Sequence, residues 1–296
     1  MVQRSACGCR GLQRAQLQRQ RLAVRADYAA TAPAMIPTKL HNGDGGSRAS
    51  DAAVILPGLG NADTDYESMA HKLEQRGAHV TVPELKRWEW GKNARAILRV
   101  REYFDGTLKP LPTLEWYVRK VREAVDRCKR ETGADSVTFV AHSAAGWLVR
   151  VWMERYDIDE VKRVICLGSP MVMPELAGFD QTRGLLTYVE RNCPGASDVH
   201  FVCAAGKYNK GSSSVRDGLR AFGTGLGYQA LCGEAEVWGD GITPLEVSYI
   251  DGSEQLVLDD VYHSPVGAPR GAMWYGDDGA IDLWAQKLFE NGNGKV

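Results

Sequence analysis

From residue 51 onward, short apolar runs alternate with segments whose apolar residues recur at helical spacing. Buried strands are predicted for the runs AAVILPG, HVTVPEL, SVTFVAH, KRVICLGSP and DVHFVCAAG. Helices are predicted for the segment that starts at Thr64, for the one that starts at Leu114, and for AAGWLVRVWMERY, GLLTYVERN and IDLWAQKLF. Strands that alternate with helices favour right-handed crossovers, so an α/β fold with a mostly parallel central sheet and helices on both faces is expected.

Local signals set the ends of the first two helices. Thr64 with Glu67 three residues later is typical of a capping box, and Gly77 ends that helix. The second helix ends at Gly133. Further β structure is predicted for EAEVWGD, EVSYI and QLVLDD.

The pattern divides the chain into three parts. Residues 1–25 are predicted to be an organelle transit peptide and residues 26–50 a flexible linker, since the latter are rich in Ala, Gly, Asn, Ser and Thr. Residues 51–296 are expected to form one folded domain. Excursions near 86–113 and 171–185 interrupt the alternation and are predicted to form a small cap.

The first segment differs from the rest in charge. It is rich in arginine and has no acidic residue before Asp27. Import sequences of organelles have this composition, and the step Val24-Arg25-Ala26 resembles cleavage sites of algal chloroplast transit peptides. Chloroplast import is therefore predicted, with the mitochondrion as the second choice and a solvated basic tail as the alternative.

Composition narrows the classes of partner. The net charge of −1 gives no reason to expect nucleic acid. No apolar run approaches the roughly 18 residues of a membrane span, which leaves only peripheral membrane contact open. The seven cysteines lack metal-ligand spacing, so no metal site is predicted.

Ser143 is the candidate nucleophile. It lies between a predicted strand and a predicted helix, where a tight turn would lift its hydroxyl above the edge of the sheet. Ala141 and Ala145, two residues to either side, are small enough for such a turn, although glycine is usual there. The alternative is a serine that only caps a helix.

Position along the chain selects the candidate base. His263 follows the last predicted strand in a polar loop, DDVYHSPVG, before the closing helix. The other histidines lie in the linker, in a helix, at strand starts or, for His142, beside the nucleophile with the ring expected to point elsewhere. The alternative for His263 is a surface-loop histidine.

Asp240 is the candidate acid. It follows a short apolar run and stands between Gly239 and Gly241, which permit a sharp turn that presents the carboxylate. The alternative is a turn without chemistry. Asp259 and Asp260 are rivals that rank lower, because they share a loop with His263.

Backbone amides supply the candidate oxyanion hole. Gly58 and Gly60 flank Leu59 at the end of the first strand, so the amide of Leu59 can turn toward the serine. The amide of Ala144 begins the helix after Ser143, where the helix dipole favours negative charge. The alternative is a turn whose glycines serve packing only.

Four blocks of sequence together resemble the α/β-hydrolase superfamily: Pro57-Gly58-Leu59-Gly60, Ala141 to Trp147, Gly239 to Leu245, and Val261 to Pro265. They are similar in particular to a plant and algal chloroplast lipase-like branch related to glycosylphosphatidylinositol inositol-deacylases. The resemblance implies an α/β-hydrolase fold and a triad of Ser143, Asp240 and His263. It also implies carboxylic ester hydrolysis without cofactor or metal.

The excursions suggest an apolar ester, and an acyl-lipid above all, as the substrate. Trp88, Trp90, Leu176 and Phe179 are predicted to bind it, with a purely structural role in the cap as the alternative. Two other functions remain open: a catalytically inactive binding or scaffold protein on the same fold, and an acyltransferase.

Overall fold

The computed structural model describes residues 51–173 and 180–290. The predicted transit peptide, residues 1–25, and the predicted linker, residues 26–50, lie outside the described residues, as do Leu176 and Phe179.

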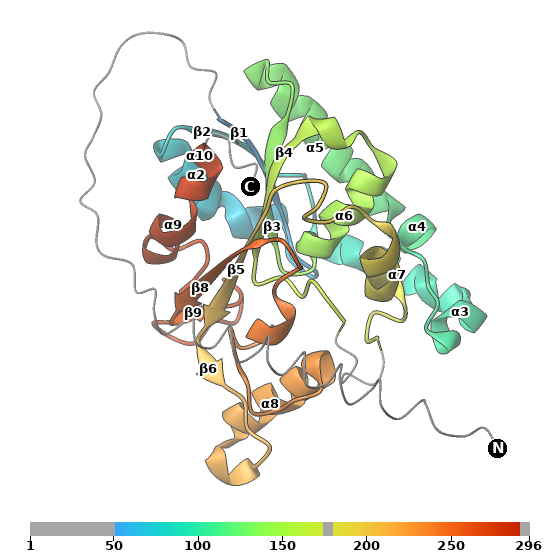
Figure 1. The fold of residues 1–296 in the computed structure, drawn as a ribbon, viewed down its shortest axis with the longest axis vertical. Coiled ribbons are helices and arrows are strands. Elements are labelled where there is room, and N and C mark those ends of the chain that lie inside the picture. The colour runs from blue at the N-terminus through green and yellow to red at the C-terminus, as the bar shows by residue number, and fades with distance from the viewer. Residues whose placement is uncertain (1–50, 174–179, 291–296) are drawn as a thin grey trace, which may run out of the picture. The chain divides into compact units, whose positions relative to one another are not determined.

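A six-stranded sheet forms the centre of the fold, in the order β2-β1-β3-β4-β5-β8, and every pair of neighbouring strands is parallel (Figure 1). The strands are β1 (Asp51–Leu56), β2 (Ala78–Thr81), β3 (Val137–His142), β4 (Val161–Leu167), β5 (Phe201–Lys207) and β8 (Glu254–Asp259). The order reverses between β1 and β3, because β2 extends the sheet to one side and the later strands extend it to the other. The carboxyl ends of the strands beside such a reversal are where sheets of this class hold their sites.

Helices cover both faces of the sheet (Figure 1). On one face lie α5 (Glu115–Thr132), α6 (Ala145–Arg155) and α7 (Leu185–Asn192), and on the other lie α2 (Glu67–Gln75), α9 (Asp278–Trp284) and α10 (Gln286–Phe289). Each face has its own apolar core: Phe139 packs with Trp152 of α6 on the first, and Ile55 lies with Trp284 of α9 on the second. Burial on both faces explains why the strands read as continuous apolar runs.

The predicted α/β class and its mostly parallel sheet are thereby confirmed. The shorter elements are η1 (Asp63–Tyr66), η2 (Arg87–Leu98), α3 (Val100–Asp105), α4 (Pro110–Thr113), η3 (Ile158–Glu160), β6 (Asn209–Lys210), η5 (Val215–Asp217), α8 (Leu219–Cys232), β7 (Trp238–Gly239), η6 (Leu245–Val247), β9 (Val261–Tyr262) and β10 (Met273–Trp274). Among the described residues, no helix has both the length and the apolar composition needed to cross a bilayer.

Two local predictions are wrong. The segment EVSYI is not a strand, since it forms η6 and a loop. The first helix does not start on a capping box of Thr64 and Glu67. The helical segment begins with η1, where the carboxylate of Asp65 accepts the backbone N–H of Ala62. The segment EAEVWGD does contain the short strand predicted for it, β7, which pairs with β6 outside the central sheet.

Helix α8 is an element that the apolar pattern does not predict. Its glycines, Gly223, Gly225 and Gly227, disfavour a helix by intrinsic propensity. Gly225 is needed for packing, because a Cβ atom there would lie 2.1 Å from the carbonyl oxygen of Ser212. Tertiary contact therefore overrides local propensity at this helix.

The two excursions that interrupt the alternation meet each other. The segment 86–113 is helical rather than irregular and forms η2, α3 and α4. Its residue Leu108 donates a backbone hydrogen bond to Arg183 of the second excursion, at 2.9 Å. Gly184 packs so closely on Gly106 that a Cβ atom would lie 2.4 Å from the Gly106 oxygen. These contacts tie the two segments into one layer beside α7.

Candidate active site

Ser143 occupies a strained turn between β3 and α6. Its φ angle of 55° lies in the left-handed region, which a residue with a side chain rarely adopts. The Ser143 amide donates to the Leu167 carbonyl at 2.9 Å, and its own carbonyl accepts from Gly146 at 3.1 Å. These bonds hold the turn that the sequence predicts for a nucleophile.

The two alanines fit this turn. Ala141 and Ala145 are both fully buried, so their methyl groups are accommodated by the surrounding core. The strict need for glycine falls one residue later, at Gly146, where a Cβ atom would lie 2.4 Å from the Ser169 hydroxyl. The departure from the usual motif thus leaves the backbone geometry intact.

His263 reaches Ser143 from the loop after β8. Its Nε2 lies 2.9 Å from the Ser143 Oγ, and its Nδ1 lies 2.7 Å from Oδ2 of Asp240. The His263 backbone N–H donates to the Asp240 carbonyl at 2.9 Å. The structure therefore brings together the three side chains that the sequence nominates from distant positions.

Asp240 is buried and accepts four hydrogen bonds. Its Oδ1 receives the backbone N–H groups of Ile242 and Thr243, at 3.0 and 2.7 Å. Its Oδ2 receives His263 Nδ1 and, at 2.9 Å, the hydroxyl of Tyr275. A carboxylate held by this many donors has a fixed orientation, from which it can orient an imidazole and stabilise its positive charge.

Two glycines make the space for this carboxylate. A Cβ atom at Gly168, which follows β4 with a φ angle of 58°, would lie 2.5 Å from Asp240 Oδ2. One at Gly206, in β5, would lie 2.9 Å from the Asp240 Cβ. The Gly206 amide donates to the Tyr275 hydroxyl at 2.7 Å, which fixes that ring against the acid. Burial, followed by the charge of Asp240, raises the pKa of Tyr275 well above its usual value, so the hydroxyl stays protonated.

The rival residues lie elsewhere. Asp259 is exposed and pairs with Lys207 at 3.4 Å, and Asp260 is also exposed. His79 contacts Glu131, and His200 contacts Arg163. None of these is placed to assist Ser143.

The loop after β1 lies against the serine. A Cβ atom at Gly58 would come within 2.7 Å of the Ser143 Cβ, so only glycine permits this approach. The backbone amides of Leu59 and Ala144 donate to no residue in 51–173 or 180–290. Both amides are therefore available as donors to an oxygen beside Ser143.

Side chains of two other elements, α5 and η2, hold this loop in place. The Tyr117 hydroxyl of α5 donates to the Pro57 carbonyl at 3.1 Å, and Trp90 Nε1 of η2 donates to the Asn61 carbonyl at 2.8 Å. Arg87 donates to the Gly60 carbonyl at 2.8 Å. An oxyanion loop fixed in this way needs little reorganisation during a reaction.

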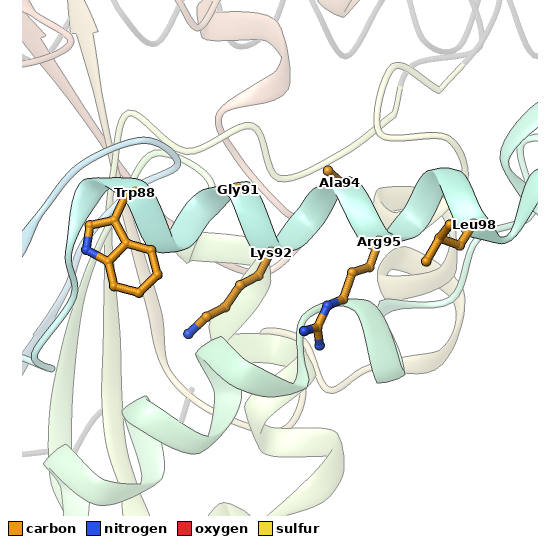
Figure 2. Close-up of a pocket in the computed structure, with 6 residues that line it drawn as sticks. All are labelled: Trp88, Gly91, Lys92, Ala94, Arg95 and Leu98. Atoms are coloured by element: carbon orange, nitrogen blue, oxygen red, sulfur yellow. The ribbon is translucent and has the colours of Figure 1, made fainter.

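Trp88 and Trp90 do not line a common pocket. The two positions lie about two-thirds of a turn apart on the 3₁₀ helix η2. Trp90 is buried between Trp116 and Tyr117, whereas Trp88 is 73% exposed. Trp88 lines a surface hollow of about 480 Å³. Figure 2 shows Trp88, Lys92 and Arg95 extending from the same side of the helix. Trp90 thus has the packing expected of a structural residue of the cap, the alternative to substrate binding, and substrate binding by Trp88 stays a prediction.

The structure places at the site three polar side chains to which the sequence assigned no role there. Tyr275 follows β10, Tyr66 ends η1, and His142 precedes the nucleophile. Only His142 carries a signal, namely its place next to Ser143. Within the described residues, no group of three or more His, Cys, Asp or Glu side chains is arranged to hold a metal ion.

Comparisons with known proteins support the fold. A metagenomic carboxyl esterase, MGS0156, matches with a TM-score of 0.50 and 16% identity over 88% of this chain and 80% of that one. The lipase BlEst2 of Bacillus licheniformis matches with a TM-score of 0.47 and 16% identity over 75% of this chain and 89% of that one. No protein-family model and no curated protein matches the chain. Together with the parallel sheet and its helices, the comparison with the esterase shows that the chain has an α/β-hydrolase fold.

Proposed function

We propose that this protein hydrolyses a carboxylic ester, with Ser143 as the nucleophile, His263 as the general base and Asp240 as its orienting acid. One observation carries the proposal. A continuous chain of hydrogen bonds runs from the Ser143 hydroxyl through His263 to a buried carboxylate, at 2.9 and 2.7 Å. A neutral serine hydroxyl becomes a nucleophile only when a base can take its proton in this way.

The first half of the reaction acylates the enzyme. Ser143 Oγ attacks the ester carbonyl carbon while its proton passes to His263 Nε2. The carbonyl π electrons move onto oxygen, and the amides of Leu59 and Ala144 stabilise the resulting oxyanion. The tetrahedral intermediate then expels the alkoxide, which takes the proton from His263. The products of this half are an alcohol and an acyl group on Ser143.

The second half regenerates the serine. A water molecule gives one proton to His263 Nε2 and attacks the acyl carbon, and the second intermediate collapses to a free acid while Ser143 recovers its proton. An acceptor alcohol in place of water would make the same site an acyltransferase. The yield of transesterified product, with and without added alcohol, distinguishes the two reactions.

A fluorophosphonate probe tests the proposal directly, because it reacts only with an activated serine. Wild-type protein is expected to label covalently at Ser143, and Ser143→Ala is expected to remain unlabelled. Asp240→Asn and His263→Ala should lower turnover of a short-chain nitrophenyl ester by at least ~10³-fold. A folded wild-type protein that does not label would instead support a binding or scaffold role.

We propose an acyl-lipid as the substrate class. The resemblance of four motif blocks to the chloroplast lipase-like branch supports this choice. So does the side chain of Leu59, which is 62% exposed and follows Gly58 in the loop that packs on the serine, where it offers apolar contact. Turnover of nitrophenyl acetate, butyrate and decanoate tests it. We expect kcat/KM to rise with chain length, because each buried methylene adds about 0.8 kcal/mol of binding. A preference for acetate contradicts the acyl-lipid class.

We also propose that η2 and α3 contact an anionic membrane surface. The exposed side chains of Trp88, Ile97, Leu98, Val100 and Phe104 are large and apolar. Segment 86–109 carries seven Lys and Arg but three Asp and Glu, although the whole chain has a net charge of −1. Arg95 is exposed and has no partner among the described residues. Apolar side chains with surplus positive charge are typical of elements that lie in the lipid interface.

Sedimentation with vesicles tests this contact. We expect the protein to bind phosphatidylglycerol vesicles more than phosphatidylcholine vesicles, and added salt to weaken the binding. Leu98→Ser combined with Phe104→Ser should lower binding at least ~10-fold, since two apolar side chains leave the interface. The control, Leu219→Ser, changes an equally exposed leucine on α8 and should bind like wild type. Equal binding by the double variant and the control argues against this surface.

Chloroplast import completes the proposal and rests on residues 1–25 alone. Incubation of the full chain with isolated chloroplasts and with mitochondria distinguishes the two destinations. N-terminal sequencing of the imported product is expected to begin near Ala26.

A further inference from the structure

His142 is a buried histidine that the proposed reaction does not use. It is 1% exposed and lies next to Ser143 at the end of β3. Its Nδ1 lies 2.6 Å from the Tyr66 hydroxyl, and its Nε2 lies 2.7 Å from the backbone carbonyl of His263. A buried polar ring with both nitrogens engaged has a single orientation available to it.

The hydrogen bonds around Tyr66 fix the direction of its proton. The Tyr66 oxygen accepts the backbone N–H of Gly58 at 3.0 Å and the side-chain N–H of Asn61 at 2.9 Å. With both donors directed at this oxygen, its own hydrogen points to His142 Nδ1, the remaining partner. The hydroxyl therefore donates to the imidazole.

The tautomer of His142 follows. A carbonyl oxygen can only accept, so Nε2 carries the ring hydrogen and donates to the His263 carbonyl. Burial, followed by the charge of His263, lowers the pKa of His142 to about 3. The ring is neutral at neutral pH, with one hydrogen on Nε2 and a lone pair on Nδ1. Along the chain of hydrogen bonds that runs from the Asn61 side chain to the His263 carbonyl, each hydrogen thus has one acceptor.

This chain of hydrogen bonds joins two separate parts of the proposed machinery. At one end Gly58 is held by Tyr66, and Gly58 is the residue that brings the oxyanion loop against Ser143. At the other end the backbone of His263 is held on both sides, by His142 at its carbonyl and by Asp240 at its N–H. The two ends come from loops that follow β1 and β8, which are not neighbours in the sheet.

We propose that His142 and Tyr66 are positioning residues, which fix the base His263 and the oxyanion loop relative to Ser143 through this single chain of hydrogen bonds. The inference rests on the proposed hydrolase function. Neither side chain exchanges a proton with the substrate. Their effect is on geometry, and a displacement of about 1 Å of a reacting group is enough to cost up to ~10²-fold in rate.

The value of kcat per active site distinguishes a positioning role from a role in fold stability alone. Titration with the fluorophosphonate probe counts competent sites, and kcat is then expressed per labelled serine. A residue that only stabilises the fold lowers the number of sites or the melting temperature, but leaves kcat per site unchanged. A positioning residue lowers kcat per site with little effect on KM.

His142→Leu and His142→Gln form the main pair of variants. Leucine removes both hydrogen bonds, so we expect kcat per labelled site to fall at least ~10-fold, with KM within about 3-fold of wild type. The glutamine amide can donate to the His263 carbonyl and accept from Tyr66, so His142→Gln should recover most of this loss.

Tyr66→Phe is the milder second variant, since it removes one oxygen atom and keeps the ring. It leaves the Gly58 N–H without its acceptor and frees the tautomer of His142, so kcat per site should fall several-fold. The control is Val164→Ala, a fully buried position in β4 that lies outside the chain of hydrogen bonds. It should lower the melting temperature through a cavity and leave kcat per site unchanged.

Different results would contradict the positioning role of His142 and Tyr66 and the hydrolase function of the protein. A wild-type protein that neither labels nor turns over ester removes both. If wild type is active but Tyr66→Phe, or a folded His142→Leu, keeps its kcat per site, the positioning role is wrong and the hydrolase function stands. An equal loss in His142→Gln and His142→Leu also overturns the role, because the hydrogen bonds would then be irrelevant.

Discussion

Tyr275 and His263 donate to the same oxygen atom of Asp240. The Tyr275 hydroxyl lies 2.9 Å from Oδ2, and His263 Nδ1 lies 2.7 Å from it. The tyrosine belongs to the segment after β10, far in sequence from the loop of the acid. A buried phenol from the loop between β10 and α9 thus completes the surroundings of the carboxylate.

Tyr275→Phe should weaken this support without removing it. Oδ2 keeps His263 as a donor, so we expect kcat to fall about 3- to 10-fold rather than by the factor of a triad deletion. The Gly206 amide loses its acceptor, which should cost about 1–3 kcal/mol of stability. Ester kinetics and urea denaturation measure the two effects. Tyr188→Phe removes a hydroxyl bonded to exposed Glu154 and is the control. A kcat equal to wild type in Tyr275→Phe would contradict the assigned contact.

Gly58→Ala should impair reactivity far more than folding. The added methyl would lie 2.7 Å from the Ser143 Cβ and 3.0 Å from the His142 carbonyl oxygen, so the loop must move away from the serine. Displacement of the Leu59 amide should lower kcat/KM by ~10²-fold or more, in line with loss of one oxyanion donor. The rate of fluorophosphonate labelling and the melting temperature are the readouts. Gly223→Ala, where a methyl meets nothing within 4 Å, is the control.

The buried ring of His142 should make stability depend on pH. Burial lowers its pKa in the folded protein to about 3, below the usual value of 6.5, so at intermediate pH the unfolded chain binds a proton that the folded protein does not. This contribution to stability is complete above about pH 6.5 and is lost as the pH falls toward 3, by at most about 1.4 kcal/mol per pH unit. Urea denaturation between pH 4 and 7 measures it. His142→Gln, which does not titrate, should show a shallower decline; the same slope as wild type would place the effect elsewhere.

Two neighbouring glycines of α8 should respond in opposite ways to alanine. At Gly225 the methyl would lie 2.1 Å from the Ser212 oxygen, so Gly225→Ala should destabilise the protein. At Gly227 nothing lies within 4 Å, and Gly227→Ala should stabilise the helix by up to about 1 kcal/mol through its better propensity. Thermal denaturation of the pair tests whether packing, rather than propensity, keeps α8 helical. Stabilisation by both substitutions would contradict the close contact.

The sequence predicts well those helices and strands that are signalled by residues within the same segment of the chain. The strands of the central sheet read as apolar runs, and α5 has an apolar stripe that ends at Gly133, in the left-handed conformation. Helix α8 was not predicted, because its glycines disfavour a helix and the close approach of Ser212 requires one of them. The start of the first helix was misplaced, because Asp65 caps the turn η1 that precedes α2. The tryptophans of η2 show the same limit: the sequence offered both as candidates for substrate binding, and only the structure showed that Trp90 is buried and Trp88 exposed.

The sequence by itself determined the alternation of strands and helices, the small residues around Ser143, and the order along the chain of Ser143, Asp240 and His263. The first two depend on residues near one another in the chain, and the order is read directly from the sequence. Only the tertiary structure decided that Asp240, and not Asp259, meets His263, and that Tyr275 and the pair Tyr66–His142 surround them. Those contacts depend on where the carboxyl ends of separate strands converge, and no local pattern encodes a distance between strands.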